Sequence, residues 1–182
     1  VFERDVNLSY KLLRYSNSAA FKRRAEISTI KQALIVLGAA EIKKFLSLLF
    51  AAQVAGDKPA ELIRLSLTRA RFTELLAINH SKLKDTGMAF LTGMMSLMDA
   101  ILDEDMESVM NKLPLSNDIK LALLEDQGLL AQYLRLVKLY EQANWQGANA
   151  IKDELGLTAG KVPDAYHDAV NWANEQMKVL AG

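Results

Sequence analysis

The chain contains one His-Asp dipeptide, His167-Asp168. An imidazole next to a carboxylate suits a divalent metal ion, so this pair is the first candidate for metal-assisted chemistry. Apolar residues recur through the C-terminal stretch at the spacing of one helical face, and neither His167 nor Asp168 belongs to that face. The second histidine, His80, lies far away in the sequence. We therefore expect His167 and Asp168 to point toward solvent, and His80 to lie at a solvated helix end or loop.

The remaining residue types offer little further chemistry. Asp103-Glu104-Asp105 is a tight acidic run, but negative charge also suits the first turn of a helix, where the helix dipole favours it. The sequence has no cysteine, which excludes a thiol nucleophile, a disulfide and a cysteine-ligated zinc site. It also lacks a Gly-rich phosphate loop and a Ser-His-Asp set. We expect no catalytic residues, no bound metal and no cofactor.

The charge balance narrows the range of partners. Lys plus Arg and Asp plus Glu number 22 each, and this balance argues against a broad nucleic-acid or anionic-membrane footprint. No stretch approaches the roughly 18 uninterrupted apolar residues of a membrane span. No signal peptide is visible. We expect a cytoplasmic protein that binds no nucleic acid and does not insert into a membrane.

Hydrophobic spacing predicts helices along most of the chain and no strand, because no segment alternates with a period of two for long enough. Ser28 is expected to cap the second helix and Gly38 to end it. The expected helices begin near residues 5, 28, 42, 59, 89, 106, 116, 129, 145 and 163. The prediction is an all-α fold, one compact bundle of about nine or ten helices over residues 1–182.

A long helix is expected over residues 59–79. Its polar residues Arg64, Arg69, Arg71 and Glu74 are interpreted as a solvated face with local ion pairs. The next helix, expected over 89–99, is apolar almost all the way round, which is typical of a helix with neighbours on every side. Glycines near its start and middle permit close approach of another helix.

Five stretches of sequence, taken in order, resemble a known family. They are 5–15 with 17–19, 27–38, 69–77, 89–99, and the end of the chain with Tyr166, Ala169, Trp172 and Ala173. Together they resemble the HDOD (HD-related output domain) family, and within it the HDOD domains that follow an EAL domain in bacterial signalling proteins. The signature residues, which we expect to be structural, are Leu12, Asn17, Ser18, Ile30, Leu37, Gly38, Phe90, Gly93 and Trp172.

The resemblance implies a fold like that of HD-domain phosphodiesterases. It also implies that the chain is a fragment of a longer protein, in which an EAL domain of the type that binds or hydrolyses cyclic di-GMP precedes residue 1. Enzymes of the HD superfamily bind metal through a first His and a later His-Asp pair, and the metal activates a water that attacks phosphorus. Aligned by eye, these positions hold Leu65, Ser96 and Leu97. We therefore expect a scaffold without a hydrolytic centre.

Three hypotheses for the function remain open. The leading one is a non-catalytic signal-transduction or output module, in cyclic di-GMP-related signalling, that binds a protein partner, its own EAL domain included. The second is a module that binds a small molecule or nucleotide in the degenerate HD cleft, with Arg69 and Arg71 as candidate contacts for a ligand or partner. The third is a residual metal-dependent phosphohydrolase.

Overall fold

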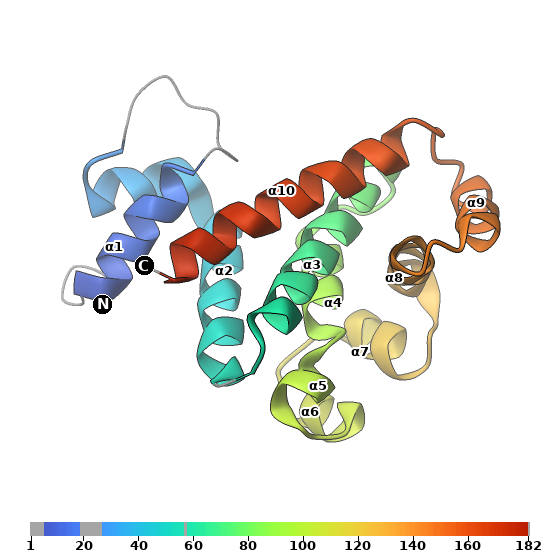
Figure 1. Ribbon diagram of the computed structural model, residues 1–182, viewed down its shortest axis with the longest axis horizontal. Helices are drawn as coiled ribbons and strands as arrows, with labels where there is room; N and C mark the ends of the chain where they lie inside the picture. Colours follow the sequence, from blue (N-terminus) through green and yellow to red (C-terminus); the bar gives the residue numbers. More distant parts are fainter. Residues whose placement is uncertain (1–5, 19–26, 57, 182) are drawn as a thin grey trace.

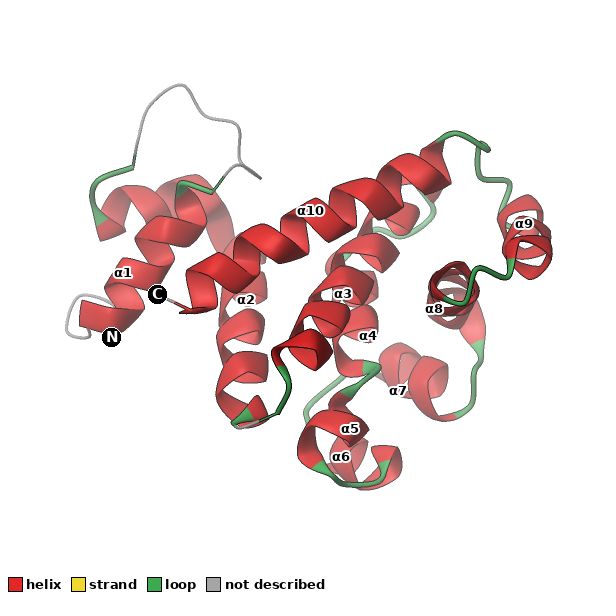
Figure 2. Ribbon diagram, viewed as in Figure 1, coloured by secondary structure: helices red, strands yellow, loops and turns green. Residues whose placement is uncertain are grey.

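The computed structural model describes residues 6–18, 27–56 and 58–181, which form ten helices and no strand (Figure 2). The predicted all-α bundle of about nine or ten helices is confirmed. The helices are α1 Val6–Ser16, α2 Ile30–Ala55, α3 Ala60–His80, α4 Gly87–Met95, α5 Met98–Leu102, α6 Met106–Lys112, α7 Asn117–Leu124, α8 Gly128–Glu141, α9 Trp145–Glu154 and α10 Lys161–Ala181. No helix in the described part of the chain combines the length and apolar character that a membrane span requires.

Helix α3 lies at the centre of the molecule. The long helix α10 runs beside it and α4 packs against it, while α1 with α2 and α8 with α9 lie at opposite ends (Figure 1). Gly93 allows the contact between α3 and α4, because a Cβ there would lie 2.6 Å from the Arg69 carbonyl carbon and closer still to the Arg69 carbonyl oxygen and Thr73 Oγ1. The predicted role of this glycine in close helix approach is confirmed.

Helix α2 contains both helices predicted on either side of Gly38, joined across a kink at that residue. Gly38 has φ 71° and ψ 174°, a conformation open essentially to glycine alone, and the helix continues on both sides of this kink.

The N-terminal cap of α2 is Thr29 and not the predicted Ser28. The Thr29 hydroxyl accepts the Gln32 backbone N–H, and the Gln32 side chain accepts the Thr29 backbone N–H, which completes a capping box.

The innermost helix is shorter than predicted. It ends at Met95, Leu97 has non-helical φ −126° and ψ 12°, and α5 begins at Met98. The prediction of one continuous helix over 89–99 is therefore wrong at its C-terminal end. The Ser96 hydroxyl donates a hydrogen bond of 2.7 Å to the Gly93 carbonyl oxygen, and this local bond favours the end of the helix over its continuation.

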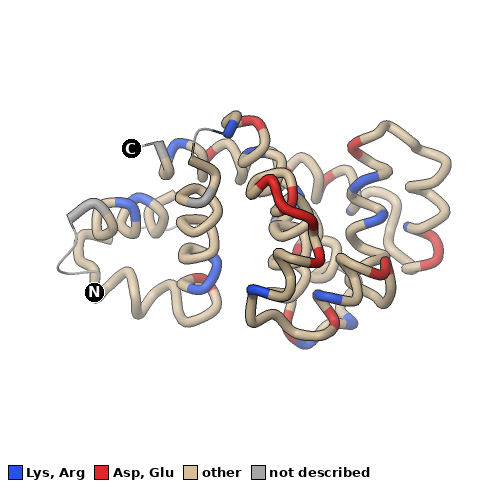
Figure 3. Tube along the Cα trace, turned by 90° about the horizontal axis from the view of Figure 1, so that it is seen from below, with Lys and Arg blue, Asp and Glu red and all other residues tan. Residues whose placement is uncertain are grey.

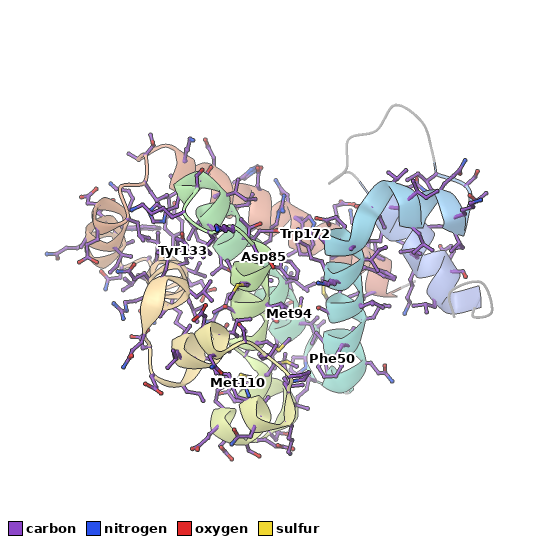
Figure 4. All side chains as sticks on the ribbon, turned by 180° about the vertical axis from the view of Figure 1, so that it is seen from behind. Phe50, Asp85, Met94, Met110, Tyr133 and Trp172 are labelled. Carbon is purple, nitrogen blue, oxygen red and sulfur yellow. The ribbon has the colours of Figure 1, made fainter. Side chains whose placement is uncertain are left out.

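Most of the resemblance signature has an evident structural role. Leu12, Leu37, Phe90 and Trp172 are buried in one hydrophobic cluster, and the rings of Phe90 and Trp172 meet edge to face with centroids 5.8 Å apart. Figure 4 labels Trp172 and, on α4, Met94, whose side chain is also fully buried. Asn17 joins the end of α1 to the residues before α2, since its side-chain amide donates to the Ile27 carbonyl oxygen at 2.8 Å and accepts the Ile27 N–H at 2.7 Å. Residues 5 and 19 of the signature stretches lie outside the described residues.

Candidate functional site

Ser96 stands directly after α4, at the first position of the expected His-Asp pair. Its hydroxyl oxygen accepts a hydrogen bond of 3.2 Å from Nη1 of Arg69, which projects from α3. Ser96 is buried, so this bond is largely shielded from solvent. The residue that follows it, Leu97, and Leu65, one helical turn before Arg69 on α3, are partly buried. Arg69 therefore joins the two segments in which the sequence analysis expected the ligand positions of an HD enzyme.

The guanidinium of Arg69 is also held by a carboxylate. Nε lies 2.9 Å from Oε1 and 3.1 Å from Oε2 of Glu141, and Nη2 lies 2.8 Å from Oε2. The side chains of Arg69 and Glu141 are only 12% and 16% exposed. A bidentate pair of this kind fixes both partners in orientation as well as in charge. We call Arg69, Ser96 and Glu141 the arginine centre.

The arginine centre corrects one sequence interpretation. Arg69 and Glu74 were expected on a solvated face, and that prediction is wrong for both, because Arg69 is mostly covered by α4 and α8 and Glu74 is 1% exposed. Arg71 is partly buried, with one guanidinium nitrogen 2.7 Å from Glu74 and its charge 6.0 Å from the centroid of the Trp172 ring. Arg64 alone matches the expectation, since its pair with Glu61 is exposed.

Glu74 belongs to a second polar group, which links three helices. Lys44 of α2 forms ion pairs with both Glu74 of α3 and Glu41, and Glu41 accepts a hydrogen bond of 3.0 Å from the Tyr15 hydroxyl of α1. Burial, followed by the nearby Glu41 carboxylate, raises the pKa of Tyr15 far above its usual value. The phenol therefore stays a hydrogen-bond donor. We call Tyr15, Glu41, Lys44, Glu74 and Arg71 the ionic chain.

A cavity of about 380 Å³ opens beside the ionic chain, between α2 and the start of α4. Lys44 and Glu74 belong to its lining, whereas Leu65, Arg69, Arg71 and Ser96 do not. The residues that line it are Ala39, Ala40, Lys43, Lys44, Ser47, Glu74, Asp85, Thr86, Gly87, Met88, Phe90 and Leu91. The cavity and the arginine centre are thus separate features of the fold.

The two histidines differ in their exposure to solvent. His167 and Asp168 are exposed on α10, as predicted. His80 ends α3, but it is more enclosed than a solvated helix end, with Nδ1 2.7 Å from the Tyr133 hydroxyl and Nε2 buried without a hydrogen-bond partner. Burial lowers the pKa of His80, and Lys82 adds to the effect. Over the described residues, no three His, Asp or Glu side chains gather closely enough to hold a metal ion.

Sequence reasoning missed Glu141 and Lys44. Glu141 is 72 residues from its partner Arg69, and it lies at the end of a predicted helix where an exposed acidic residue is ordinary. Lys44 occupies a helix whose apolar residues alone were used for the prediction. Neither residue carries a local signal, because each is defined by a partner on another helix.

The N-terminal end of the molecule is basic and partly apolar at its surface. Helices α1 and α2 hold five Lys or Arg and one Glu, and blue outnumbers red along them in Figure 3. Large apolar side chains on α2 are exposed, with Ile35 71%, Val36 45%, Leu46 45% and Phe50 41% accessible. We call these four residues the α2 apolar face.

Comparison with known proteins places this fold in a family. The HDOD domain family matches residues 1–113. The cyclic di-GMP phosphodiesterase CdgJ of Vibrio cholerae is 39% identical over 176 residues, which are 97% of this chain and 41% of that protein. YuxH of Bacillus subtilis is 33% identical over 178 residues, which are 96% of this chain and 43% of that protein. No solved structure matches significantly.

The chain thus spans about two fifths of the length of these relatives, and it aligns with them almost from end to end. The helical scaffold, the buried signature residues and the family match agree with one another. The chain belongs to the HDOD domain family.

Proposed function

We propose that this chain is a non-catalytic signal-transduction module that acts by binding a protein partner. The observation that carries the proposal is the arginine centre, in which the Arg69 guanidinium bridges Ser96 and Glu141. It lies between the segments that would supply metal ligands in an HD enzyme. A folded scaffold with a closed ion pair at this position favours a binding role over hydrolysis.

The chemistry of the arginine centre supports this reading. A hydrolytic metal needs imidazole or carboxylate ligands and an open coordination position for water. A hydroxyl at Ser96 and an alkyl side chain at Leu97 meet neither need. Glu141, which is linked to Ser96 through Arg69, has both oxygens engaged by the guanidinium. A guanidinium, which has no vacant orbital for a water ligand, cannot activate water as a Lewis acid does.

The relatives support a place in cyclic di-GMP-related signalling. CdgJ is described as a cyclic di-GMP phosphodiesterase, and this chain corresponds to 41% of its length. We assign to this part of such a protein a role in signal output and not in the hydrolysis of cyclic di-GMP. Its partner is a protein, and an EAL domain in the same longer chain is one such partner.

The α2 apolar face supports a protein partner. Exposed large apolar side chains gathered on one helix are costly in water and mark surfaces that another protein covers. Lys11 and Arg14 on α1 and Lys31 on α2 add positive charge at this end of the molecule, which suits a partner with acidic groups.

A binding experiment with surface variants tests the proposal. The purified chain is cross-linked to proteins of its source cell, the bound protein is identified and purified, and its affinity is measured for the native chain and for Ile35→Glu and Phe50→Glu. We expect each variant to weaken binding about tenfold or more, the range of a central interface residue. Leu124→Glu, on α7, replaces an apolar residue of matched exposure, 41% against 41% for Phe50, and should bind like the native chain. Equal affinity for all variants, or a chain that binds no protein, would overturn the proposal.

A further inference from the structure

The cavity between α2 and α4 has no part in the arginine centre or in the α2 apolar face. Its volume of about 380 Å³ falls within the range of pockets that hold small ligands. One wall comes from residues 39–47 of α2, and the other comes from the segment around Asp85, labelled in Figure 4, and the first turns of α4. Glu74 of α3 completes the lining, so the cavity is bounded by three elements that meet only through tertiary packing.

Most of the cavity surface is apolar. Ala39 and Ala40 leave space on the α2 side, while Met88 and Leu91 present aliphatic side chains on the α4 side. At the floor, Phe90 is 1% exposed, and its ring centroid lies 5.6 Å from the Lys44 ammonium. This combination suits a ligand with a compact apolar body.

The charges around the cavity leave one cation without an ionic partner. Lys44 is paired with Glu41 and Glu74, and Glu74 is further paired with Arg71. Asp85 accepts the Gly87 N–H at 2.9 Å, at the positive end of α4. Lys43 is exposed and forms no ion pair with any residue in the described part of the chain. Two lysines and two carboxylates line the cavity, and the Asp85 carboxylate is held by the start of α4, so Lys43 is the ammonium in this lining that remains available to a ligand.

We propose that this cavity binds a small organic anion with an apolar body, whose carboxylate or phosphate group pairs with Lys43 and whose body rests between Ala40 and Met88. The apolar walls supply affinity and the Lys43 ammonium supplies the charge preference. A bound ligand would contact Lys44 and Glu74, the ion pair that joins α2 to α3. The site is independent of the partner surface and of the arginine centre.

The dye 1-anilinonaphthalene-8-sulfonate is the test probe, because it carries one anionic group on an apolar body. Its fluorescence is titrated with the purified chain, together with N-phenyl-1-naphthylamine, which lacks the sulfonate. We expect one saturable site for the sulfonate dye. Ala40→Phe, which fills the cavity from an exposed position of α2, should lower the affinity for both dyes at least tenfold. Lys43→Glu should weaken only the anionic dye, by about tenfold.

Matched variants separate this site from other apolar surface. Ala150→Phe on α9 and Lys138→Glu on α8 change exposed residues outside the cavity and should leave both dyes unaffected. Circular dichroism melts confirm that each variant is folded. The absence of saturable binding, or dye binding that Ala40→Phe and Lys43→Glu leave unchanged, would overturn the proposal.

Competition then assigns the anionic group. Displacement of the dye by 1-naphthyl phosphate alone assigns a phosphate ester, and displacement by 1-naphthoate alone assigns a carboxylate. Displacement by both compounds assigns an anionic group on an apolar body, with either a phosphate ester or a carboxylate accepted. Displacement by neither contradicts the proposed ligand class. None of these outcomes depends on protein partner binding, so the two proposals can fail separately.

Discussion

At the scale of single residues, Arg69 has the most contacts to explain. Its guanidinium bonds to a hydroxyl from the end of α4 and to both oxygens of a carboxylate at the end of α8. The side chain therefore ties three helices together at one buried point. Removing this side chain should therefore lower the stability of the fold.

Arg69→Met should lower the free energy of unfolding by about 2–4 kcal/mol, because it leaves the Glu141 carboxylate mostly buried without its cation. The double variant Arg69→Met/Glu141→Leu should recover much of this loss, since no unpaired charge remains. Arg64→Met breaks an exposed pair with Glu61 and should cost less than about 1 kcal/mol. Urea denaturation measures the free energy of unfolding of all three variants. An Arg69→Met variant as stable as the native chain would contradict a stabilising buried pair.

His80 should make stability depend on pH. Its pKa is lowered from the ordinary value of 6.5, first by burial and then by Lys82, so the unfolded chain binds a proton more readily than the folded chain. The contribution of His80 is complete above pH 6.5 and is lost as the pH falls through the lowered pKa. Tyr133, its hydrogen-bond partner, does not titrate in this range, because burial raises its pKa to about 12.

The measurement compares unfolding free energies at pH 7.5 and pH 5 for the native chain and His80→Gln. We expect the native chain to lose more stability than His80→Gln on acidification. His167→Gln changes the exposed histidine of α10 and serves as the control. Parallel pH profiles for the native chain and His80→Gln would show that His80 is not the titrating group.

At the scale of secondary-structure elements, α3 and α4 approach closely at Gly93. Gly93→Ala would place a methyl group against the Arg69 carbonyl and Thr73, where the backbone of α3 has no room to give. We expect a loss of about 3 kcal/mol or more, seen as a melting temperature lower by roughly 6–12 °C. Gly160→Ala meets no atom within 4 Å and should change little. A native melting temperature for Gly93→Ala would rule out this contact.

Local sequence rules predicted most of the helices and the break at Gly38, because spacing and glycine conformation act within a few residues. They failed at Ser96, where a side-chain hydrogen bond to Gly93 ends a helix that apolar character alone would extend. They failed again at Glu74, which looks like a surface residue until Lys44 and Arg71 are placed beside it. The arginine centre could not be predicted, because Arg69 and Glu141 meet only in the folded chain.

At the scale of the whole molecule, the residues that pack together extend beyond the residues that match the family. The HDOD match covers residues 1–113, but Glu141 and Trp172 come from beyond it and contact Arg69 and Phe90. Helix α10 covers α3 along the centre of the fold (Figure 1). The expectation of one domain over residues 1–182 stays a prediction, and this packing agrees with it.

Truncation tests that prediction. A chain of residues 1–113 loses α7–α10, so it exposes apolar residues of α3 such as Phe72 and Leu76, which are 0% exposed in the full chain and cluster with residues of the lost helices. We expect no cooperative thermal transition by circular dichroism and poor dispersion of amide signals by NMR. The full chain, measured in parallel, should melt cooperatively. A cooperative transition of the shorter chain would show that the domain ends near residue 113.

The proposed function rests on one central claim, that this HDOD chain performs no hydrolysis at the arginine centre. The most direct measurement is the turnover of cyclic di-GMP and bis(p-nitrophenyl) phosphate by the purified chain with Mn²⁺ or Mg²⁺. We predict a rate equal to that of the buffer without protein. Turnover that EDTA abolishes and that Ser96→Ala or Glu141→Gln reduces would contradict the claim.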